Sequence, residues 1–197
     1  MMLAKQTGTS GIERISAQID SSVETIKSLH GELENIEAIC RTVVEALKAG
    51  KKIMTAGNGG SAAEALHFAE ELSGRFRNDR VALPGMALPA DVTAITCIGN
   101  DFGYEFIFSR QLEAFGQLGD VLILFTTSGN SSNLPPALEA AQLRDIKVIC
   151  LLGKDGGMLA GKGDHEIIVP GQAGEHIQEA HQVILHIVLD AVEIAFA

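Results

Sequence analysis

The chain has 197 residues, 46% of them hydrophobic, and a formal net charge of −10. This length and composition suit one domain with a full core, and the hydrophobic content is too high for a disordered chain. The negative charge argues against non-specific binding to nucleic acid or to an anionic membrane, because both need a basic face, but it leaves room for a small anionic substrate.

Cysteine usage and the apolar runs indicate where the protein works. The three cysteines are widely spaced and odd in number, so they fit no disulfide framework or zinc ribbon and favour a reducing compartment. The start of the chain lacks the apolar segment of a signal peptide, and no apolar run approaches the roughly 20 residues of a membrane span. We therefore expect a cytoplasmic protein with no membrane and no nucleic-acid partner.

The first fifty residues predict helices. Residues 1–10 are expected to form a frayed tail. From Ser10 to Ala49, apolar residues recur at three- and four-residue steps, and Gly31 is a candidate break between two helices. We expect a helical hairpin over residues 1–50 that belongs to the same domain as the rest and covers a sheet face or a subunit interface.

Residues 51–197 alternate short apolar runs with helical patterns. Strands are expected at 53–56, 81–88, 120–125, 147–152 and 166–169, with helices at 61–75, 91–98, 104–115, from 134, and 175–196. Pro84 places the start of the second strand outside a central ladder. The alternation predicts a three-layer α/β/α fold with a doubly wound parallel sheet of about five strands, whose ligands bind beyond the carboxyl ends of the strands.

Two polar turns follow predicted strands. In the first, glycines flank Asn58 and Ser61 follows, so the backbone can bend sharply and aim N–H groups at an anion. The second, Thr126–Ser132, places hydroxyl groups and Gly129 before a helix, which makes the stronger phosphate site. Neither turn carries a P-loop lysine or a dinucleotide fingerprint, so a nucleoside triphosphate is not expected.

Two helices carry groups suited to acid–base or metal chemistry. His67 and Glu71 lie four residues apart and share one helix face. In the last helix, Gln178, Gln182 and His186 step by four and can converge on a site that the helix passes. His176 and His181 have no assigned role, and we expect them to face solvent or to pack in an interface.

Five motifs carry a family resemblance. AGNGGSAAEALHFAEELSGRF, IGNDFGYEFIFSRQ, TTSGNSSN, LLGKDGG and IQEAHQVILHIV follow one another over nearly all of residues 10–197. In this order they closely resemble the bacterial sedoheptulose-7-phosphate isomerases, the phosphoheptose isomerases of the sugar-isomerase (SIS) domain superfamily.

The resemblance implies a flavodoxin-like SIS fold with added N-terminal helices, in a homotetramer with sites at subunit interfaces. It implies conversion of D-sedoheptulose 7-phosphate to D-glycero-D-manno-heptose 7-phosphate through an enediol. This is the first step towards nucleotide-activated heptose for lipopolysaccharide core or surface polysaccharide. The alternatives are a non-catalytic relative that binds a replication initiator protein, or an isomerase for another phosphosugar. Retention of Glu71 and His186 argues against the first alternative.

The resemblance also implies residue roles. Glu71 is the catalytic base and His186 the acid, and one Zn²⁺ per subunit is held by the metal set of His67, Glu71, Gln178 and His186. The substrate-binding set is Asn58, Gly59, Gly60, Ser61, Glu71, Arg75, Asn100, Asp101, Thr126, Thr127, Ser128, Ser131, Glu175 and Gln178. The family often has Ser at Thr126 and Asp at Glu175, so Thr126 keeps the hydroxyl while the contact of Glu175 is less certain.

Overall fold

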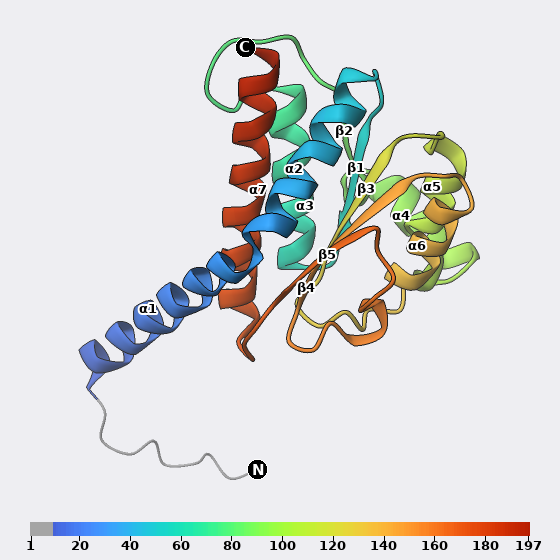
Figure 1. Cartoon of the computed structure of the whole chain (residues 1–197). Helices are drawn as coiled ribbons and strands as arrows, with labels where there is room; N and C mark the ends of the chain where they lie inside the picture. Colours follow the sequence, from blue (N-terminus) through green and yellow to red (C-terminus); the bar gives the residue numbers. More distant parts are fainter. Residues whose placement is uncertain (1–9) are drawn as a thin grey trace.

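The computed structural model describes residues 10–197, so most of the tail expected over residues 1–10 lies outside the described residues. Five strands form one parallel sheet in the order β2-β1-β3-β4-β5, which is the predicted flavodoxin-like arrangement (Figure 1). The strands are β1 (Ile53–Gly57), β2 (Gly85–Ala87), β3 (Val121–Phe125), β4 (Lys147–Gly153) and β5 (His165–Val169).

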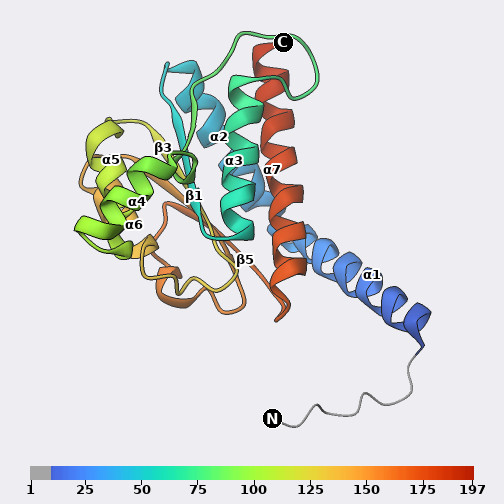
Figure 2. The same ribbon diagram turned by 180° about the vertical axis from the view of Figure 1, so that it is seen from behind.

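Helices cover both faces of the sheet. One face carries α2 (Leu33–Lys48), α3 (Gly60–Ser73) and α7 (Gly174–Phe196), and the other carries α4 (Val92–Asp101), α5 (Ser109–Phe115) and α6 (Leu134–Gln142) (Figures 1 and 2). Side chains of β3 alternate between the two layers: Ile123 and Phe125 pack with α3 and α7, and Leu124 packs with α5 and α6. Burial on both faces explains why this strand is a continuous apolar run.

The N-terminal helices differ from the expected hairpin. Helix α1 (Gly11–Lys27) starts at a capping box in which Glu13 N donates to Ser10 Oγ (3.2 Å) and Ser10 N donates to Glu13 Oε2 (2.7 Å). The 3₁₀ turn η1 (Ser28–Glu32) then continues into α2 along a bent path (Figure 1). Gly31 lies in the turn that divides the two helices, as predicted. The hairpin prediction is wrong, because Gly31 does not take a positive φ and the chain is not reversed.

Three other boundaries differ from the sequence expectation. The second strand is confined to Gly85–Ala87 at the sheet edge, with Pro84 outside it as predicted. Asp91 caps α4, since its Oδ1 accepts from Ala94 N (2.9 Å), but the helix continues to Asp101 and breaks only at Gly103. The helix expected over 104–115 is divided into the 3₁₀ turn η3 (Tyr104–Phe106) and α5. Among the described residues, no helix combines the length and hydropathy needed to cross a bilayer.

Candidate active site

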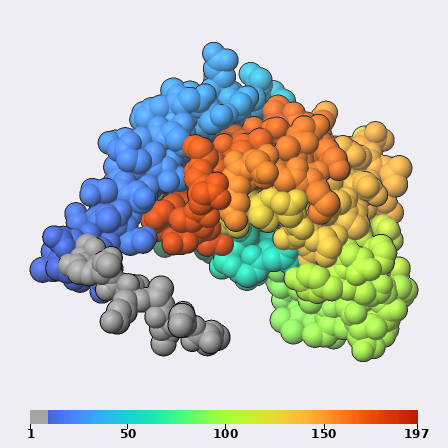
Figure 3. All heavy atoms as spheres, turned by 90° about the horizontal axis from the view of Figure 1, so that it is seen from below, coloured from blue at the N-terminus to red at the C-terminus, as the bar shows by residue number. Residues whose placement is uncertain are grey.

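The two polar turns lie side by side at one end of the sheet. They follow β1 and β3, which pair in parallel from Ile53 with Val121 to Gly57 with Phe125. The strand order reverses between these two strands, and this is where open parallel sheets bind ligands. Figure 3 looks onto this end of the molecule, where the teal start of α3, the yellow second turn and the orange-red start of α7 gather.

A small cavity separates the two turns. Its volume is about 70 Å³, enough for a compact group but not for a whole sugar. It is lined by Asn58, Ser61, Phe125, Thr126, Thr127, Ser128, Ser131 and Gln178. All but Phe125 belong to the predicted substrate-binding set. A larger hollow of about 520 Å³ lies near the amino ends of β3 and β4, away from these groups.

Thr126 holds the second turn in shape. Its side chain is buried, and its Oγ1 accepts from Gly129 N (3.1 Å). Gly129 has a φ of 64°, and a Cβ there would lie 1.8 Å from the carbonyl oxygen of Gly156. The turn is therefore locked against the loop that follows β4, and the hydroxyls of Thr127, Ser128 and Ser131 line the cavity.

The first turn is tied to the second by amide hydrogen bonds. Asn58 and Asn133 exchange two hydrogen bonds of 2.9 Å, and Tyr104 donates its hydroxyl to Asn58 Oδ1 (2.7 Å). Gly60 packs directly against α7, where a Cβ added to Gly60 would lie 2.4 Å from Gln178 Nε2. Gly60 is thus small so that Gln178 can reach the cavity.

Farther along α3, His67 and Glu71 meet as predicted. Gln182 Nε2 donates to His67 Nδ1 (3.0 Å), so the imidazole carries its proton on Nε2 and donates to Glu71 Oε1 (3.3 Å). The His186 ring lies 5.3 Å from the His67 ring, centroid to centroid, at an angle of 77°. The structure therefore brings His67, Glu71 and His186 together from two helices.

His186 is held against an aromatic ring. Phe76 stacks on it with a centroid distance of 5.9 Å and an interplanar angle of 20°. Desolvation lowers the pKa of His186, and the neighbouring His67 and Arg77 lower it further, while Glu71 raises it. His186 is therefore neutral at neutral pH, when it can donate one ring proton and accept another.

The site suits a cation at its imidazole and carboxylate groups. Ligand atoms of His67, Glu70 and Glu71 all lie within 4.8 Å of one another. Gln178 lies beside Gly60, at the phosphate-cavity end of α3, and the residue that contacts His67 from α7 is Gln182. The structure thus groups His67, Glu71 and His186, with Gln178 one helical turn away from Gln182 on α7.

Seven of the fourteen predicted substrate-binding residues do not line the cavity of this chain. Three of them, Gly59, Gly60 and Glu71, belong to the start or the last turns of α3, and the other four lie elsewhere. Arg75 is exposed and pairs with Asp79 (2.9 Å). Asn100 donates to Asp101 Oδ1 (2.7 Å), and both are exposed in α4. Glu175 borders a hollow between α1 and α7 instead.

Sequence reasoning missed three residues of this region. Asn133 is fully buried and Tyr104 donates to Asn58, and both belong to motifs of the family resemblance, TTSGNSSN and IGNDFGYEFIFSRQ, that assign them no role. Gln182 belongs to the series of residues spaced by four along the last helix, Gln178, Gln182 and His186, but it was not predicted as a site residue. His181 was expected at the surface or in an interface but lies in the core: it is fully buried, and its Nε2 contacts the Leu152 carbonyl (3.1 Å).

Comparison with known proteins identifies the family. Residues 17–153 match the model of the SIS domain. A phosphoheptose isomerase of Photorhabdus laumondii is 46% identical over 184 residues, covering 91% of this chain and 94% of the relative. One from Enterobacter is 47% identical, covering 91% and 95%. This chain is a member of the phosphoheptose isomerase family of SIS-domain proteins.

Solved structures of the phosphoheptose isomerase family have the same fold. The enzyme from Francisella tularensis superposes with a TM-score of 0.91 at 34% identity, covering 94% of this chain and all of that one. The enzyme from Neisseria gonorrhoeae gives 0.86 at 37%, with the same coverage. The NanR protein of Vibrio vulnificus, complexed with ManNAc-6P, is 18% identical with a TM-score of 0.63, so its likeness shows the fold alone.

Proposed function

We propose that this chain converts D-sedoheptulose 7-phosphate to D-glycero-D-manno-heptose 7-phosphate. The observation that carries the proposal is the grouping of Glu71 and His186, from α3 and α7, on the same pair of helices that borders the hydroxyl-lined cavity. The 46–47% sequence identity to phosphoheptose isomerases, over 91% of this chain, supports the proposal. The product would begin the supply of nucleotide-activated heptose for lipopolysaccharide core or surface polysaccharide.

The phosphate end of the substrate would bind at the cavity. Hydroxyls of Ser61, Thr127, Ser128 and Ser131 offer donors there, and α3 begins at Gly60, where its dipole favours an anion. Local donors of this kind act at short range, so the net charge of −10 does not prevent binding.

The reacting end would lie farther along α3, towards Glu71, whose side chain leans back towards the start of the helix. An aldose–ketose isomerase moves a proton between neighbouring carbons, so it needs a base at carbon and a shuttle at oxygen. Glu71 is the base, and His186, neutral because burial lowers its pKa, passes a proton between the two oxygens. His67 orients the Glu71 carboxylate through its 3.3 Å contact.

The residues of this site fit a divalent metal ion, and we propose Zn²⁺. Imidazole and carboxylate are ligands that zinc prefers, and His67, Glu71 and His186 supply them, with Gln178 as the fourth ligand from the resemblance. When bound, the ion would polarise the substrate carbonyl.

Metal binding is tested without reference to turnover. Isothermal titration of chelator-treated protein with Zn²⁺ is expected to give one site per subunit. His67→Ala is expected to weaken binding at least tenfold, because it removes one ligand of four. His30→Ala, which removes an exposed imidazole in η1, serves as the matched control. Equal affinities in the two variants would refute the proposed ligand set.

We further propose a cytoplasmic homotetramer with sites completed at subunit interfaces. The exposed apolar stripe of α1 supports association between copies, and the exposure of Arg75, Asp101 and Glu175 leaves them accessible to a site that two subunits share. All three cysteines are free thiols, as a reducing compartment requires.

Turnover assays test the function itself. Glu71→Gln and His186→Ala are each expected to lower turnover of sedoheptulose 7-phosphate by ~10²-fold or more while the protein stays folded. Glu139→Gln, which removes an exposed carboxylate of α6, is the control and should retain activity. A faster rate on five- or six-carbon phosphosugars would favour another isomerase. The absence of both turnover and phosphosugar binding would favour a non-catalytic module.

A further inference from the structure

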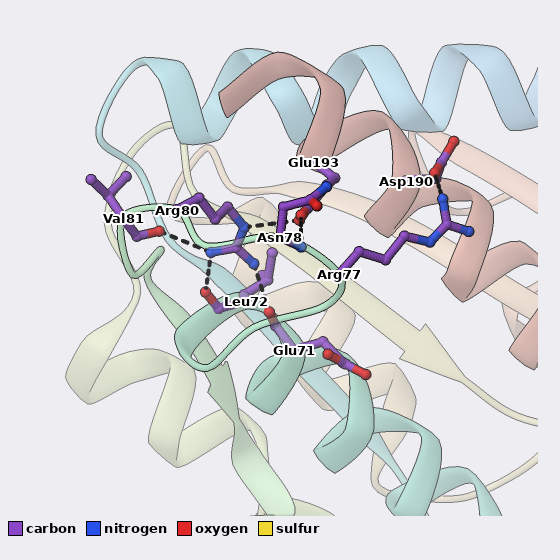
Figure 4. Close-up of polar contacts among 8 residues, drawn as sticks. All are labelled: Glu71, Leu72, Arg77, Asn78, Arg80, Val81, Asp190 and Glu193. Atoms are coloured by element: carbon purple, nitrogen blue, oxygen red, sulfur yellow. Dashed lines mark hydrogen bonds and ion pairs between the residues drawn. The ribbon is translucent and has the colours of Figure 1, made fainter. Parts of the chain in front are cut away.

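The connection between α3 and β2, residues 74–84, contains a buried arginine. The side chain of Arg80 is 2% exposed. Its Nη1 donates to the carbonyls of Leu72 and Val81, both at 2.9 Å, and its Nη2 donates to the carbonyl of Glu71 at 2.6 Å (Figure 4). The last carbonyls of a helix lack intrahelical donors, so one guanidinium caps the end of α3 at the residue that carries the proposed base.

The same guanidinium faces α7. Arg80 Nε lies 3.4 Å from Glu193 Oε2, an ion pair without good hydrogen-bond geometry, and the Glu193 side chain is 7% exposed. Glu193 Oε1 accepts from Asn78 N at 2.5 Å. Buried charges are held only when they are paired, so this contact ties the end of α3 and the 74–84 connection to α7.

A second contact from the connection reaches α7 nearer the proposed acid. Arg77 pairs with Asp190, four residues beyond His186 (Figure 4). Arg77 also lies over the Phe76 ring, with 4.8 Å from its Cζ to the centroid, and Phe76 stacks on His186. The connection therefore contacts the Glu71 backbone at one end and the His186 ring at the other.

We propose that Arg80, paired with Glu193, is a positioning residue for the isomerase reaction. It sets the separation of Glu71 and His186 by fixing the end of α3 against α7. Such a residue acts on the proton-transfer step and not on phosphate binding, because the phosphate cavity lies at the opposite end of α3. This role rests on the proposed isomerase function.

The test compares variants of the full-length protein for kcat and KM with sedoheptulose 7-phosphate. Arg80→Lys keeps the charge but loses the planar fork that spans two helices. The double variant Arg80→Met with Glu193→Gln removes both charges, so neither is left buried alone. Arg144→Lys is the matched control, because Arg144 binds the Ala140 carbonyl in α6, far from the site.

Positioning predicts a kcat at least tenfold lower in Arg80→Lys and in the double variant, with KM within about twofold of wild type, and a normal kcat in Arg144→Lys. Measurements are made on protein that circular dichroism shows to be folded, well below its melting temperature. A lower melting temperature with unchanged kcat would overturn the positioning role and leave the isomerase intact. Wild-type protein without turnover would instead overturn the isomerase function and the role together.

Discussion

At the scale of single residues, the interface of α3 and α7 buries two ionisable groups beneath the proposed site. Glu64 Oε1 lies 3.9 Å from His181 Nδ1, and neither atom has a hydrogen bond. Burial raises the pKa of Glu64 to about 7, although the Ser61 hydroxyl offsets part of this, and burial lowers the pKa of His181 to about 4. Both groups therefore favour their neutral forms in the folded protein.

This predicts how Glu64→Gln changes the pH dependence of stability. A raised carboxyl pKa means that the folded protein binds the proton more tightly. The cost of ionising Glu64 is absent below about pH 4.5, grows as pH rises, and is complete above about pH 7, where it amounts to about 3 kcal/mol. Glutamine does not ionise, so between pH 4.5 and pH 8 the free energy of unfolding of the variant should fall by about 3 kcal/mol less than that of wild type.

Urea unfolding at several pH values and one protein concentration measures this difference. His181 is unchanged in both proteins, so its own opposite dependence, in which stability falls as pH drops from 6.5 to 4, cancels in the comparison. Parallel stability curves for the two proteins would contradict the prediction.

At the scale of elements, the phosphate cavity depends on two turns that other segments hold in place. The turn after β3 is locked by Thr126 and packs against the loop after β4. Asn133, at the entry to α6, links it to the turn after β1. The hydroxyl groups are thus arranged before a ligand arrives, which lowers the entropic cost of binding.

Gly129→Ala should disrupt this arrangement. It combines a left-handed φ with a backbone clash at Gly156, so we expect a loss of about 3 kcal/mol or more and weaker phosphosugar binding. Gly161→Ala has the same sign of φ, at 73°, and open space around the new Cβ, so it should cost only about 1–2 kcal/mol. Thermal unfolding and substrate titration measure both variants. Equal losses of stability in the two would show that the close contact of Gly129 with Gly156 does not contribute to the effect.

At the scale of the whole molecule, α1 has no buried residue and carries an apolar stripe. Ile12, Ile15 and Ile19 are 80%, 62% and 58% exposed. The helix projects from the body along the start of α7 (Figures 1 and 2). A sustained apolar stripe on a projecting helix is costly in water, which supports the proposal that other copies cover it.

The double variant Ile15→Glu with Ile19→Glu should therefore reduce the size of the assembly. Charges placed on the stripe would have to be buried without partners in the interface. Ala17→Glu adds the same kind of charge on the opposite face of α1 and is expected to leave the assembly intact. Light scattering after size-exclusion chromatography measures the mass. An unchanged mass in the double variant would exclude this stripe as the interface.

The sequence by itself determined the sheet, the two polar turns and the His67–Glu71 pair. These follow from local patterns: apolar runs make strands, small and hydroxyl residues make turns, and four-residue spacing aligns side chains on a helix. It also predicted that Gln178 and His186 share one line along the last helix, and the family resemblance supplied the reaction.

Only the tertiary structure decided which groups meet across α3 and α7. Gln182, rather than Gln178, contacts His67, because the register of two packed helices depends on all the side chains between them. The hairpin prediction failed because the turn that contains Gly31 divides α1 from α2 but does not reverse the chain, and whether two helices fold back on each other depends on what each of them packs against. The role of Arg80 could not be predicted from the sequence, because the sequence does not distinguish an exposed arginine from a buried one that caps a helix. Only folding brings its guanidinium to the Glu71 carbonyl.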